Sequence, residues 1–200
     1  MDFIFMLTRD DMTVRDCLEL LDGLGDLHLA NLGFKDVGVD PATLTRLHRR
    51  IKDTGAASYL EVVSTSRDRA LDSARMAVDL GVDWLMGGTW IPETLELLDG
   101  TGIGYLPFPG VPTGHPTRLG GTPQQVAEHC RRFEQAGCAG VDLLAYRLVV
   151  AGSITTPGQI HDLAAAGVDA FTIGSGAMTG AFEPRSKTLD GQLTAILDAT

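Results

Sequence analysis

The chain has 200 residues, a formal net charge of −10 and a pI near 4.8. This length suits one domain, and the acidic balance argues against nucleic acid and anionic membrane surfaces as partners. The sequence shows neither a membrane-spanning apolar run nor a secretory leader pattern. Its three cysteines lack paired spacing, so reduced thiols and a cytoplasmic location are expected.

Short apolar runs alternate with segments of helical periodicity along the chain, which predicts a parallel α/β sheet. The predicted strands cover residues 3–7, 27–32, 57–63, 82–86, 103–108, 141–146, 148–151 and 168–173. The predicted helices cover residues 14–21, 41–54, 67–80, 92–98, 123–136, 157–166 and 189–197. Helix starts are indicated by Thr13, by Asp40 before a proline, and by Thr122 and Thr156, each followed three residues later by Gln.

The last two predicted strands both end in turns built from Gly and Ser. Turns with little side chain let backbone N–H groups approach an anion closely. In an eight-stranded α/β barrel, the last two strands often hold a phosphate. A phosphate site is therefore predicted, and the alternative is that these turns are only tight strand exits. The predicted phosphate-binding residues are Gly152, Ser153, Gly174, Ser175 and Gly176.

The segments AGSITTPGQI (151–160) and AGVDAFTIGSGAM (166–178) resemble the final two βα units of the ribulose-phosphate-binding barrel superfamily. That group includes ribulose-phosphate epimerases, hexulose-phosphate synthases, keto-deoxy-phosphogluconate aldolases and indole-glycerol-phosphate-type enzymes. The resemblance implies a (β/α)8 TIM-type barrel, a single domain over residues 1–200, a small phosphorylated substrate and a possible homodimer. Outside these segments only the βα rhythm matches.

The tripeptide Gly-Val-Asp occurs at 81–83, 140–142 and 167–169, each time between a predicted helix and a predicted strand. Glycine permits a left-handed helix end, and the aspartate can bond local backbone N–H groups. These aspartates are therefore predicted to be structural and to lie at strand starts, away from the catalytic face of a barrel.

The spacing of this repeat is irregular in its second half. Two predicted strands, 141–146 and 148–151, leave no room for a crossover, which needs about a dozen residues or more. The sequence thus predicts a barrel that lacks helix 6, and a segment absent between Arg147 and Leu148 is the favoured reason. The alternatives are a wrong strand assignment or an interrupted barrel.

The chain has only three lysines against thirteen arginines, and Lys35 lies next to Asp36 after the second predicted strand. A cation and a carboxylate there could polarise a carbonyl and move a proton; the alternative is a solvated ion pair. Glu61 is predicted to point into the barrel, because a carboxylate under the helices would be unpaired. It could act as a general base or bind a divalent cation, or it could form a salt bridge with Lys35 or an arginine.

Other candidates lie in loops. Arg9 and Arg147 could pair with a substrate anion, and the alternative is a surface salt bridge. His115 lies in the long loop 109–121, which could close over a substrate. His115 could contact the substrate and transfer a proton there, and the alternative is a solvated histidine. Three histidines on predicted helices are expected to be surface residues: His48, His129 and His161.

These features predict an enzyme, a carbon–carbon lyase of the aldolase type that acts on a small phosphorylated sugar or keto acid through an enolate-like intermediate. Lys35 would stabilise the enolate oxygen, and Glu61 or Asp36 would move the proton. No cofactor is required by the sequence, although Mg²⁺ is possible. The alternatives are an isomerase or epimerase, and a catalytically silent barrel that binds a phospho-ligand.

The chain also departs from the reactions of the resembled families. The segment VDLLAYR (141–147) lacks the Schiff-base lysine of the aldolases, and the third predicted strand lacks the D-x-K signature of the hexulose-phosphate synthases. The second and third predicted strands have no histidine at their exits, where the epimerases carry one.

Overall fold

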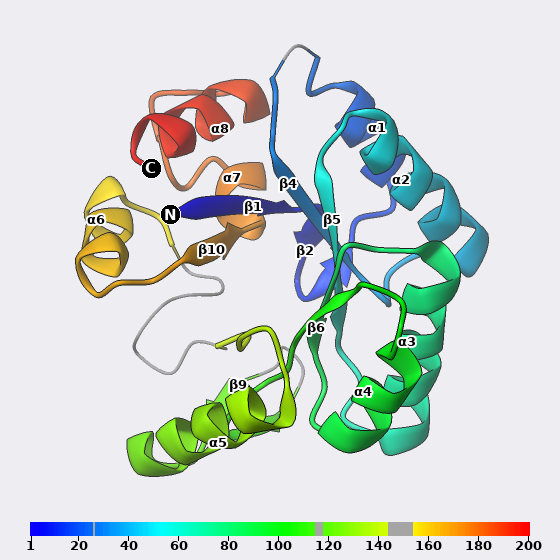
Figure 1. The fold of residues 1–200 in the computed structure, drawn as a ribbon. Helices are drawn as coiled ribbons and strands as arrows, with labels where there is room; N and C mark the ends of the chain where they lie inside the picture. Colours follow the sequence, from blue (N-terminus) through cyan, green and yellow to red (C-terminus); the bar gives the residue numbers. More distant parts are fainter. Residues whose placement is uncertain (26, 115–117, 144–153) are drawn as a thin grey trace.

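The computed structural model describes residues 1–25, 27–114, 118–143 and 154–200. Six parallel strands form one sheet in the order β10-β1-β4-β5-β6-β7. The sheet curls around an interior, as in a TIM-type barrel (Figure 1). Its strands are β1 (Asp2–Met6), β4 (Asn31–Lys35), β5 (Ala57–Val62), β6 (Trp84–Gly87), β7 (Gly104–Leu106) and β10 (Ala170–Ile173).

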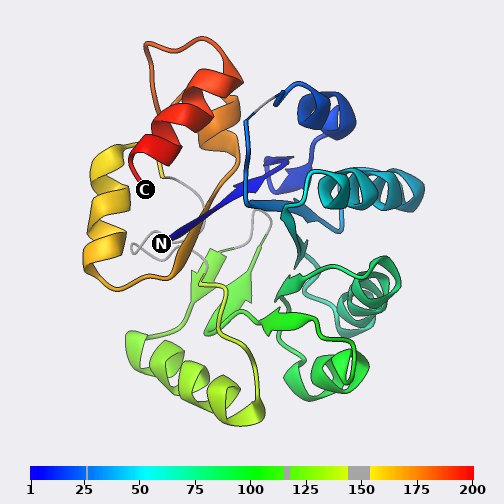
Figure 2. The same cartoon turned by 45° about the horizontal axis from the view of Figure 1, so that its top comes forward.

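Helices follow the strands and lie around the outside of the curled sheet (Figure 2). The predicted alternation of strand and helix is confirmed, and no helix within the described ranges is long and apolar enough to cross a membrane. The helices are α1 (Cys17–Asp22), α2 (Pro41–Asp53), α3 (Arg67–Leu80), α4 (Ile91–Leu98), α5 (Pro123–Ala136), α6 (Pro157–Ala165), α7 (Ser175–Met178) and α8 (Leu189–Asp198). The described residues also include two antiparallel strand pairs: β2 (Thr8–Arg9) with β3 (Met12–Thr13), and β8 (Val111–Thr113) with β9 (Arg118–Gly120).

Three predicted helix starts are confirmed. Asp40 accepts a hydrogen bond from the N–H of Thr43, and complete capping boxes open α5 at Thr122 and α6 at Thr156. The prediction that Thr13 caps a helix is wrong. Its hydroxyl instead donates to the carbonyl of Lys35 and accepts from the N–H of Lys35, so this residue joins a hairpin to β4.

Apolar side chains form an outer layer and an inner layer, because successive residues of a strand face opposite sides of the sheet. The larger cluster lies between sheet and helices and includes Phe5, Phe34 and Leu60. A smaller cluster of strand residues, including Met6 and Tyr59, occupies the inner face. The rings of Tyr59 and Trp84 stack there with centroids 5.9 Å apart. The inner face is therefore filled by large side chains near the amino-terminal ends of the strands.

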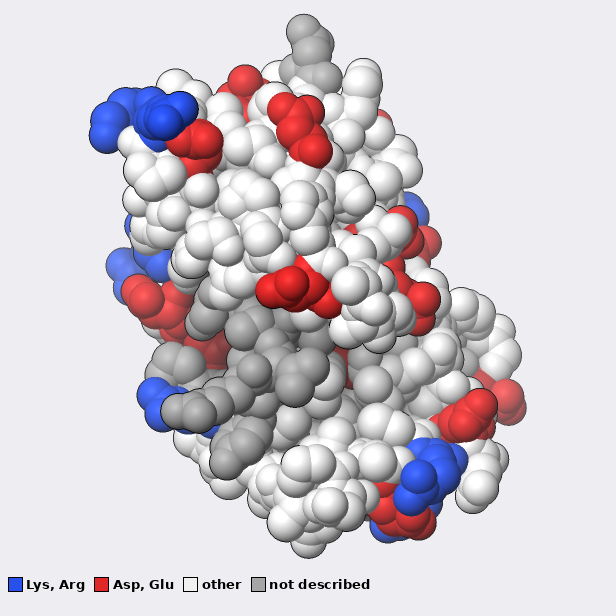
Figure 3. Space-filling view, turned by 90° about the vertical axis from the view of Figure 1, so that its left-hand side faces the viewer, with Lys and Arg blue, Asp and Glu red and all other residues white. Residues whose placement is uncertain are grey.

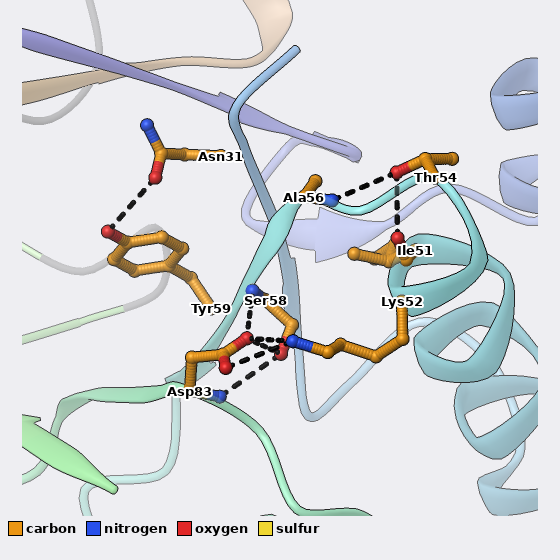
Figure 4. A network of polar contacts seen from close by, with 8 residues as sticks. All are labelled: Asn31, Ile51, Lys52, Thr54, Ala56, Ser58, Tyr59 and Asp83. Atoms are coloured by element: carbon orange, nitrogen blue, oxygen red, sulfur yellow. Dashed lines mark hydrogen bonds and ion pairs between the residues drawn. The ribbon is translucent and has the colours of Figure 1, made fainter. Parts of the chain in front are cut away.

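Asp83 ties the starts of two strands together (Figure 4). Its Oδ2 accepts hydrogen bonds from the N–H of Ser58 at 2.7 Å and from the hydroxyl of Ser58 at 2.8 Å. Lys52 on α2 donates to both oxygens of the same carboxylate. Gly81 ends α3 in the left-handed conformation with φ 73°. The predicted structural role of this Gly-Val-Asp segment is confirmed.

The second copy of the tripeptide is placed differently. Helix α5 ends at Ala136, and its left-handed cap is Gly137 with φ 92°, three residues before Gly140. The N–H of Ala139 already bonds the carbonyl of Tyr105, and the N–H of Asp142 bonds the carbonyl of Pro107. Asp142 therefore lies level with the carboxyl end of β7, and the prediction that it occupies a strand start is wrong.

Other predicted boundaries also shift. The second strand covers Asn31–Lys35 rather than 27–32, because Leu29 packs into the outer core without joining the ladder. The loop 109–121 contains the β8–β9 hairpin. The described residues do not include most of the predicted strand 141–146 or any of the predicted strand 148–151. The proposed gap between Arg147 and Leu148 also lies outside them. The absence of helix 6 stays a prediction.

Candidate active site

Lys35 and Glu61 form the centre of the candidate site. Lys35 is the last residue of β4 and is paired directly with Glu61 on β5. Lys35 Nζ donates to Glu61 Oε1 at 2.9 Å, and the two side chains are 9% and 8% exposed. Both share the inner face with Gly33 and Tyr59, two residues earlier on each strand. The predicted inward orientation of Glu61, and the alternative of a salt bridge with Lys35, are confirmed.

Asp11 contributes a second carboxylate that sequence reasoning missed. It lies in the turn of the β2–β3 hairpin, where Asp10 and Asp11 have φ values of 52° and 64°. Aspartate tolerates this left-handed region better than most residues. The turn brings the Asp11 carboxylate into a hydrogen-bonded ion pair with Lys35 Nζ. An Asp-Asp pair after a predicted strand indicates such a turn, but the chain does not show where the turn will point.

This arrangement fixes the charge of Lys35. Burial by itself lowers the pKa of an ammonium group, but the charges and hydrogen bonds of Glu61 and Asp11 outweigh burial and raise the pKa of Lys35 above its ordinary value. Burial raises the pKa of Glu61, and the neighbouring Lys35 opposes that rise. Lys35 is therefore held as a cation at neutral pH.

Asp142, beside the end of β7, interacts with the same cluster. The residue is 6% exposed, and its carboxyl interacts electrostatically with Glu61, Lys35 and Asp11. Burial and then the charge of Glu61 raise the pKa of Asp142 well above its ordinary value. Sequence reasoning assigned this residue a structural role, because its tripeptide matches that of Asp83.

Asp36 is turned toward helix α3. Its Oδ1 accepts the N–H of Val63 at 3.0 Å, and its Oδ2 accepts the hydroxyl of Ser73. Burial raises the pKa of Asp36, and these hydrogen bonds oppose the rise. The structure thus brings Lys35 and Glu61 together, and it assigns both oxygens of Asp36 to contacts that hold β5 and α3.

The predicted phosphate residues after the last strand lie at the start of α7. A Cβ at Gly174 would come within 2.8 Å of the Thr8 carbonyl, and a Cβ at Gly176 within 2.9 Å of the Ile154 carbonyl. Close packing therefore requires these glycines. Helix α7 also contacts β2, which carries the exposed Arg9. Four predicted residues lie outside the described part of the chain: His115, Arg147, Gly152 and Ser153.

A cavity of about 270 Å³ opens at the carboxyl ends of β5, β6 and β7. Its lining includes Ser64, Thr89, Trp90 and Phe108. The cavity borders the loops that leave the same edge of the sheet as Lys35 and Glu61, so this end of the fold offers room for a small molecule.

Two of the helix histidines differ from prediction. His48 is buried on the sheet-facing side of α2 between Leu44 and Ile51, so the surface prediction is wrong for this residue. His129 Nδ1 accepts the N–H of Gly110 at 3.0 Å and joins α5 to the loop before β8. His161 is exposed, as predicted.

Within the described ranges, no group of three or more His, Cys, Asp or Glu side chains is arranged to hold a metal ion. The role of Mg²⁺ stays a prediction.

Acidic side chains are spread over the face that carries α6 and α8, with the basic ones in separate small groups (Figure 3). The predicted absence of nucleic-acid and membrane partners likewise stays a prediction.

No family model matches the chain, and no curated protein matches its sequence. Solved structures do match it. Orotidine 5'-phosphate decarboxylase from Pyrococcus horikoshii OT3 has a TM-score of 0.64 at 11% identity, over 98% of each chain. A designed, cube-shaped porous protein cage made by fusing symmetric oligomeric domains has a TM-score of 0.64 at 11% identity, over 100% of this chain and 73% of the other. A FabK variant from Thermotoga maritima has a TM-score of 0.54 at 14% identity, over 88% and 61%.

At these identities the matches concern the fold alone. The match with orotidine 5'-phosphate decarboxylase extends over nearly the whole of both chains, with the same curled parallel sheet and outer helices. The structural match therefore confirms the kind of fold that the resemblance implied, an α/β fold with a curled parallel sheet.

Proposed function

We propose that this chain is an enzyme, a carbon–carbon lyase that acts on a small phosphorylated sugar or keto acid. The observation that carries the proposal is the buried Lys35 ammonium, held between Glu61 and Asp11 at the carboxyl end of the strands. In barrels of this type, the catalytic groups lie at that end. The fold shared with a phosphate-substrate decarboxylase supports the same reaction class.

Breaking a carbon–carbon bond next to a carbonyl leaves an electron pair that spreads onto the carbonyl oxygen. A fixed cation lowers the energy of this developing enolate without reorganising in the transition state. Lys35 is such a cation, and its ammonium can then deliver a proton to the carbanion carbon. Loss of carbon dioxide and loss of an aldehyde produce the same kind of intermediate, so both lie within the proposal.

The charge of Lys35 argues against an imine mechanism. A Schiff base forms from a neutral amine, whereas the two carboxylates raise the pKa of Lys35 and keep it protonated. The proposed reaction therefore uses Lys35 as an electrostatic and proton-donating group. This agrees with the absence of a Schiff-base lysine from residues 141–147.

The phosphate is proposed to bind at the start of α7. The first N–H groups of a helix have no partner within it, and a short extra helix after the last strand often holds phosphate in these barrels. Helix α7 lies directly after β10 and before α8. Backbone N–H groups of Gly174, Ser175 and Gly176 would contact the phosphate, with Arg9 on the adjoining hairpin as a counter-charge.

An isomerase or epimerase is the second candidate, because the raised pKa of Glu61 suits a proton-abstracting base. Lys35 would stabilise the same enolate. A silent phospho-ligand binding barrel is the third. Such a barrel would bind the same ligands without turning them over. Packing alone accounts for Gly174 and Gly176, so these glycines by themselves do not support a phosphate site.

The first experiment is a thermal-shift screen of phosphorylated sugars and keto acids, with and without Mg²⁺, on wild type and Ser175→Asp. A phosphate site predicts ligands that raise the melting temperature of wild type but not of the variant. Equal shifts in both proteins, or none in either, would remove the phosphate site from the proposal.

Turnover of each ligand found is then measured in wild type, Lys35→Met and Lys52→Met. Lys52 forms an exposed ion pair at the opposite end of the strands and serves as the matched control. Loss of about 10²–10³ in kcat is expected for Lys35→Met alone, as for other preorganised charge-stabilising groups. Binding without turnover of any ligand would favour the silent barrel, and proton exchange without bond cleavage would favour the isomerase.

A further inference from the structure

We propose that Asp142 is a further catalytic residue of this site, a neutral carboxylic acid that donates a hydrogen bond to the carbonyl oxygen of the substrate. This inference rests on the proposed lyase function and deepens it. It specifies that the substrate carries a ketone or aldehyde oxygen beside the bond that breaks. It also assigns the two ends of the developing enolate to different groups, with the oxygen at Asp142 and the carbon at Lys35.

The position of Asp142 comes from the three-residue offset of its tripeptide. Because Gly137 rather than Gly140 caps α5, Asp142 lies beyond the strand start, where its N–H bonds the carbonyl of Pro107 after β7. In the sheet order, β6 lies between β7 and β5, the strand of Glu61, and β4, the strand of Lys35, lies beyond β5. The electrostatic contact of Asp142 with both residues therefore passes across the interior of the curled sheet.

One oxygen of the Asp142 carboxyl lacks, among the described residues, the contacts that a structural aspartate makes. Within the described part of the chain, its buried Oδ2 has no hydrogen-bond partner. Asp83, in the same tripeptide, bonds the backbone and hydroxyl of Ser58 and the ammonium of Lys52. A buried polar atom without a partner is unfavourable. The unused oxygen of Asp142 is accounted for if its partner is the substrate.

The charged groups that face Asp142 favour its neutral form. Among the described residues, these are Glu61 on β5, Lys35 on β4 and Asp11 in the β2–β3 turn. Glu61 and Asp11 both bond the Lys35 ammonium, whereas Asp142 makes no such bond. With the other three groups ionised, the cluster already carries one net negative charge. A further charge on Asp142 would be buried and repelled by Glu61, so the proton resides on Asp142 and gives it an O–H donor.

The step balances with the groups of this site and solvent. When the carbon–carbon bond breaks, either carbon dioxide leaves, or an aldehyde leaves as its hydroxyl gives a proton to Glu61, which later releases it to solvent. The electron pair of the broken bond moves toward the carbonyl oxygen and strengthens the hydrogen bond from Asp142. Proton transfer along that bond gives an enol and an Asp142 carboxylate. When the enol collapses to a ketone, its O–H proton returns to Asp142 while the carbon takes a proton from Lys35. Asp142 is thereby restored, and Lys35 is reprotonated from solvent.

The protonation of Asp142 can be measured without any substrate. Side-chain carboxyl carbons of protein labelled with ¹³C-aspartate are followed by NMR over a range of pH in wild type, Asp142→Asn and Asp169→Asn. Asp169 belongs to the same tripeptide motif but is exposed, which makes it the matched control. We expect the resonance that vanishes only in Asp142→Asn to stay protonated well above the ordinary range of an aspartate. Ionisation of every aspartate in the ordinary range would overturn the proposal.

The catalytic role is tested on a substrate found by the turnover screen. In wild type, kcat/KM should fall as rising pH removes the proton of Asp142, and this fall should be absent in Asp142→Asn, whose amide still donates. Asp142→Leu, which has no donor, should lose about 10²–10³ in kcat, while Asp169→Asn should match wild type. Identical pH profiles in wild type and Asp142→Asn would overturn the role.

Failure of the inference and failure of the proposed function give different results. Turnover that depends on Lys35 but not on Asp142 would overturn the inference and leave the lyase proposal standing. A protonated Asp142 resonance in a protein that cleaves no substrate would overturn the lyase function, and the catalytic role of Asp142 with it.

Discussion

Lys35 Nζ donates a hydrogen bond to Glu61 Oε1 at 2.9 Å, between residues that are directly paired on neighbouring parallel strands. The pair lies on the inner face, above the Tyr59 and Trp84 rings that fill the interior near the strand starts. A buried cation at this level must be matched by carboxylates. Four ionisable side chains consequently gather at one end of the sheet, and their charges depend on one another.

Removal of the cation should destabilise the fold. Lys35→Met leaves Asp11 and Glu61 buried without their partner, and breaking such a pair typically costs about 3–5 kcal/mol. The pKa values of both carboxyls should then rise above their unfolded values, so the variant should lose stability as pH rises and recover part of it in acid. Urea unfolding of wild type and variant at several pH values measures both effects.

Lys52→Met is the control for that experiment. In its ion pair with Asp83, the Lys52 side chain is 42% exposed and the Asp83 side chain 37%. Exposed ion pairs contribute about 0–1 kcal/mol to the stability of a protein. A loss of stability as large in Lys52→Met as in Lys35→Met would contradict the assignment of a special burial penalty to the Lys35 cluster.

Asp36 should behave as a structural residue. Asp36→Ala removes the acceptor for the Val63 N–H and the Ser73 hydroxyl, and leaving such groups unsatisfied costs about 1–3 kcal/mol. A double-mutant cycle with Ser73→Ala should show a coupling of about 0.5–3 kcal/mol in urea unfolding, as for residues in contact. Loss of turnover without loss of stability would instead make Asp36 the proton-transfer group.

His48 should make stability depend on pH. Burial, and next the charge of Lys52, lower the pKa of His48 below its ordinary value, while Asp83 opposes this. The unfolded chain therefore binds a proton more readily than the folded chain, so stability is lost as pH falls from the unfolded pKa toward the folded pKa. The stability of His48→Leu relative to wild type should therefore be higher at pH 5 than at pH 8.

Urea midpoints at the two pH values measure the difference, with His161→Leu as an exposed control. The same pH dependence in wild type and His48→Leu would show that other groups cause it.

Gly104 should tolerate no side chain. A Cβ at this position would overlap the Trp84 ring that stacks on Tyr59, and overpacking of a core typically costs about 1–3 kcal/mol. Gly158→Ala is the control, because Gly158 lies in α6 and a Cβ there would meet only the Thr156 hydroxyl oxygen at 4.0 Å. The control should gain about 0.4–1 kcal/mol. Melting temperatures that move together would refute this account of the inner face.

Sequence alone predicted the features that depend on local contacts. The capping boxes at Thr122 and Thr156 join groups three residues apart, and the left-handed end of α3 at Gly81 closes on the last turn of its own helix. The inward direction of Glu61 follows from strand alternation and the unfavourable burial of an unpaired charge. The strand–helix rhythm and the resemblance in the last two βα units likewise indicated an α/β fold with a curled parallel sheet, which the structure shows.

The composition of the site was decided by tertiary structure. Asp11 reaches Lys35 through a turn whose direction is set when Thr13 bonds the backbone of Lys35. Asp83 and Asp142 share one tripeptide, yet one closes a strand entry and the other faces the interior. That difference arises because Gly137 ends α5 three residues early, and the following segment pairs with β7 in a shifted register. Register depends on contacts between distant segments, which local sequence patterns do not contain.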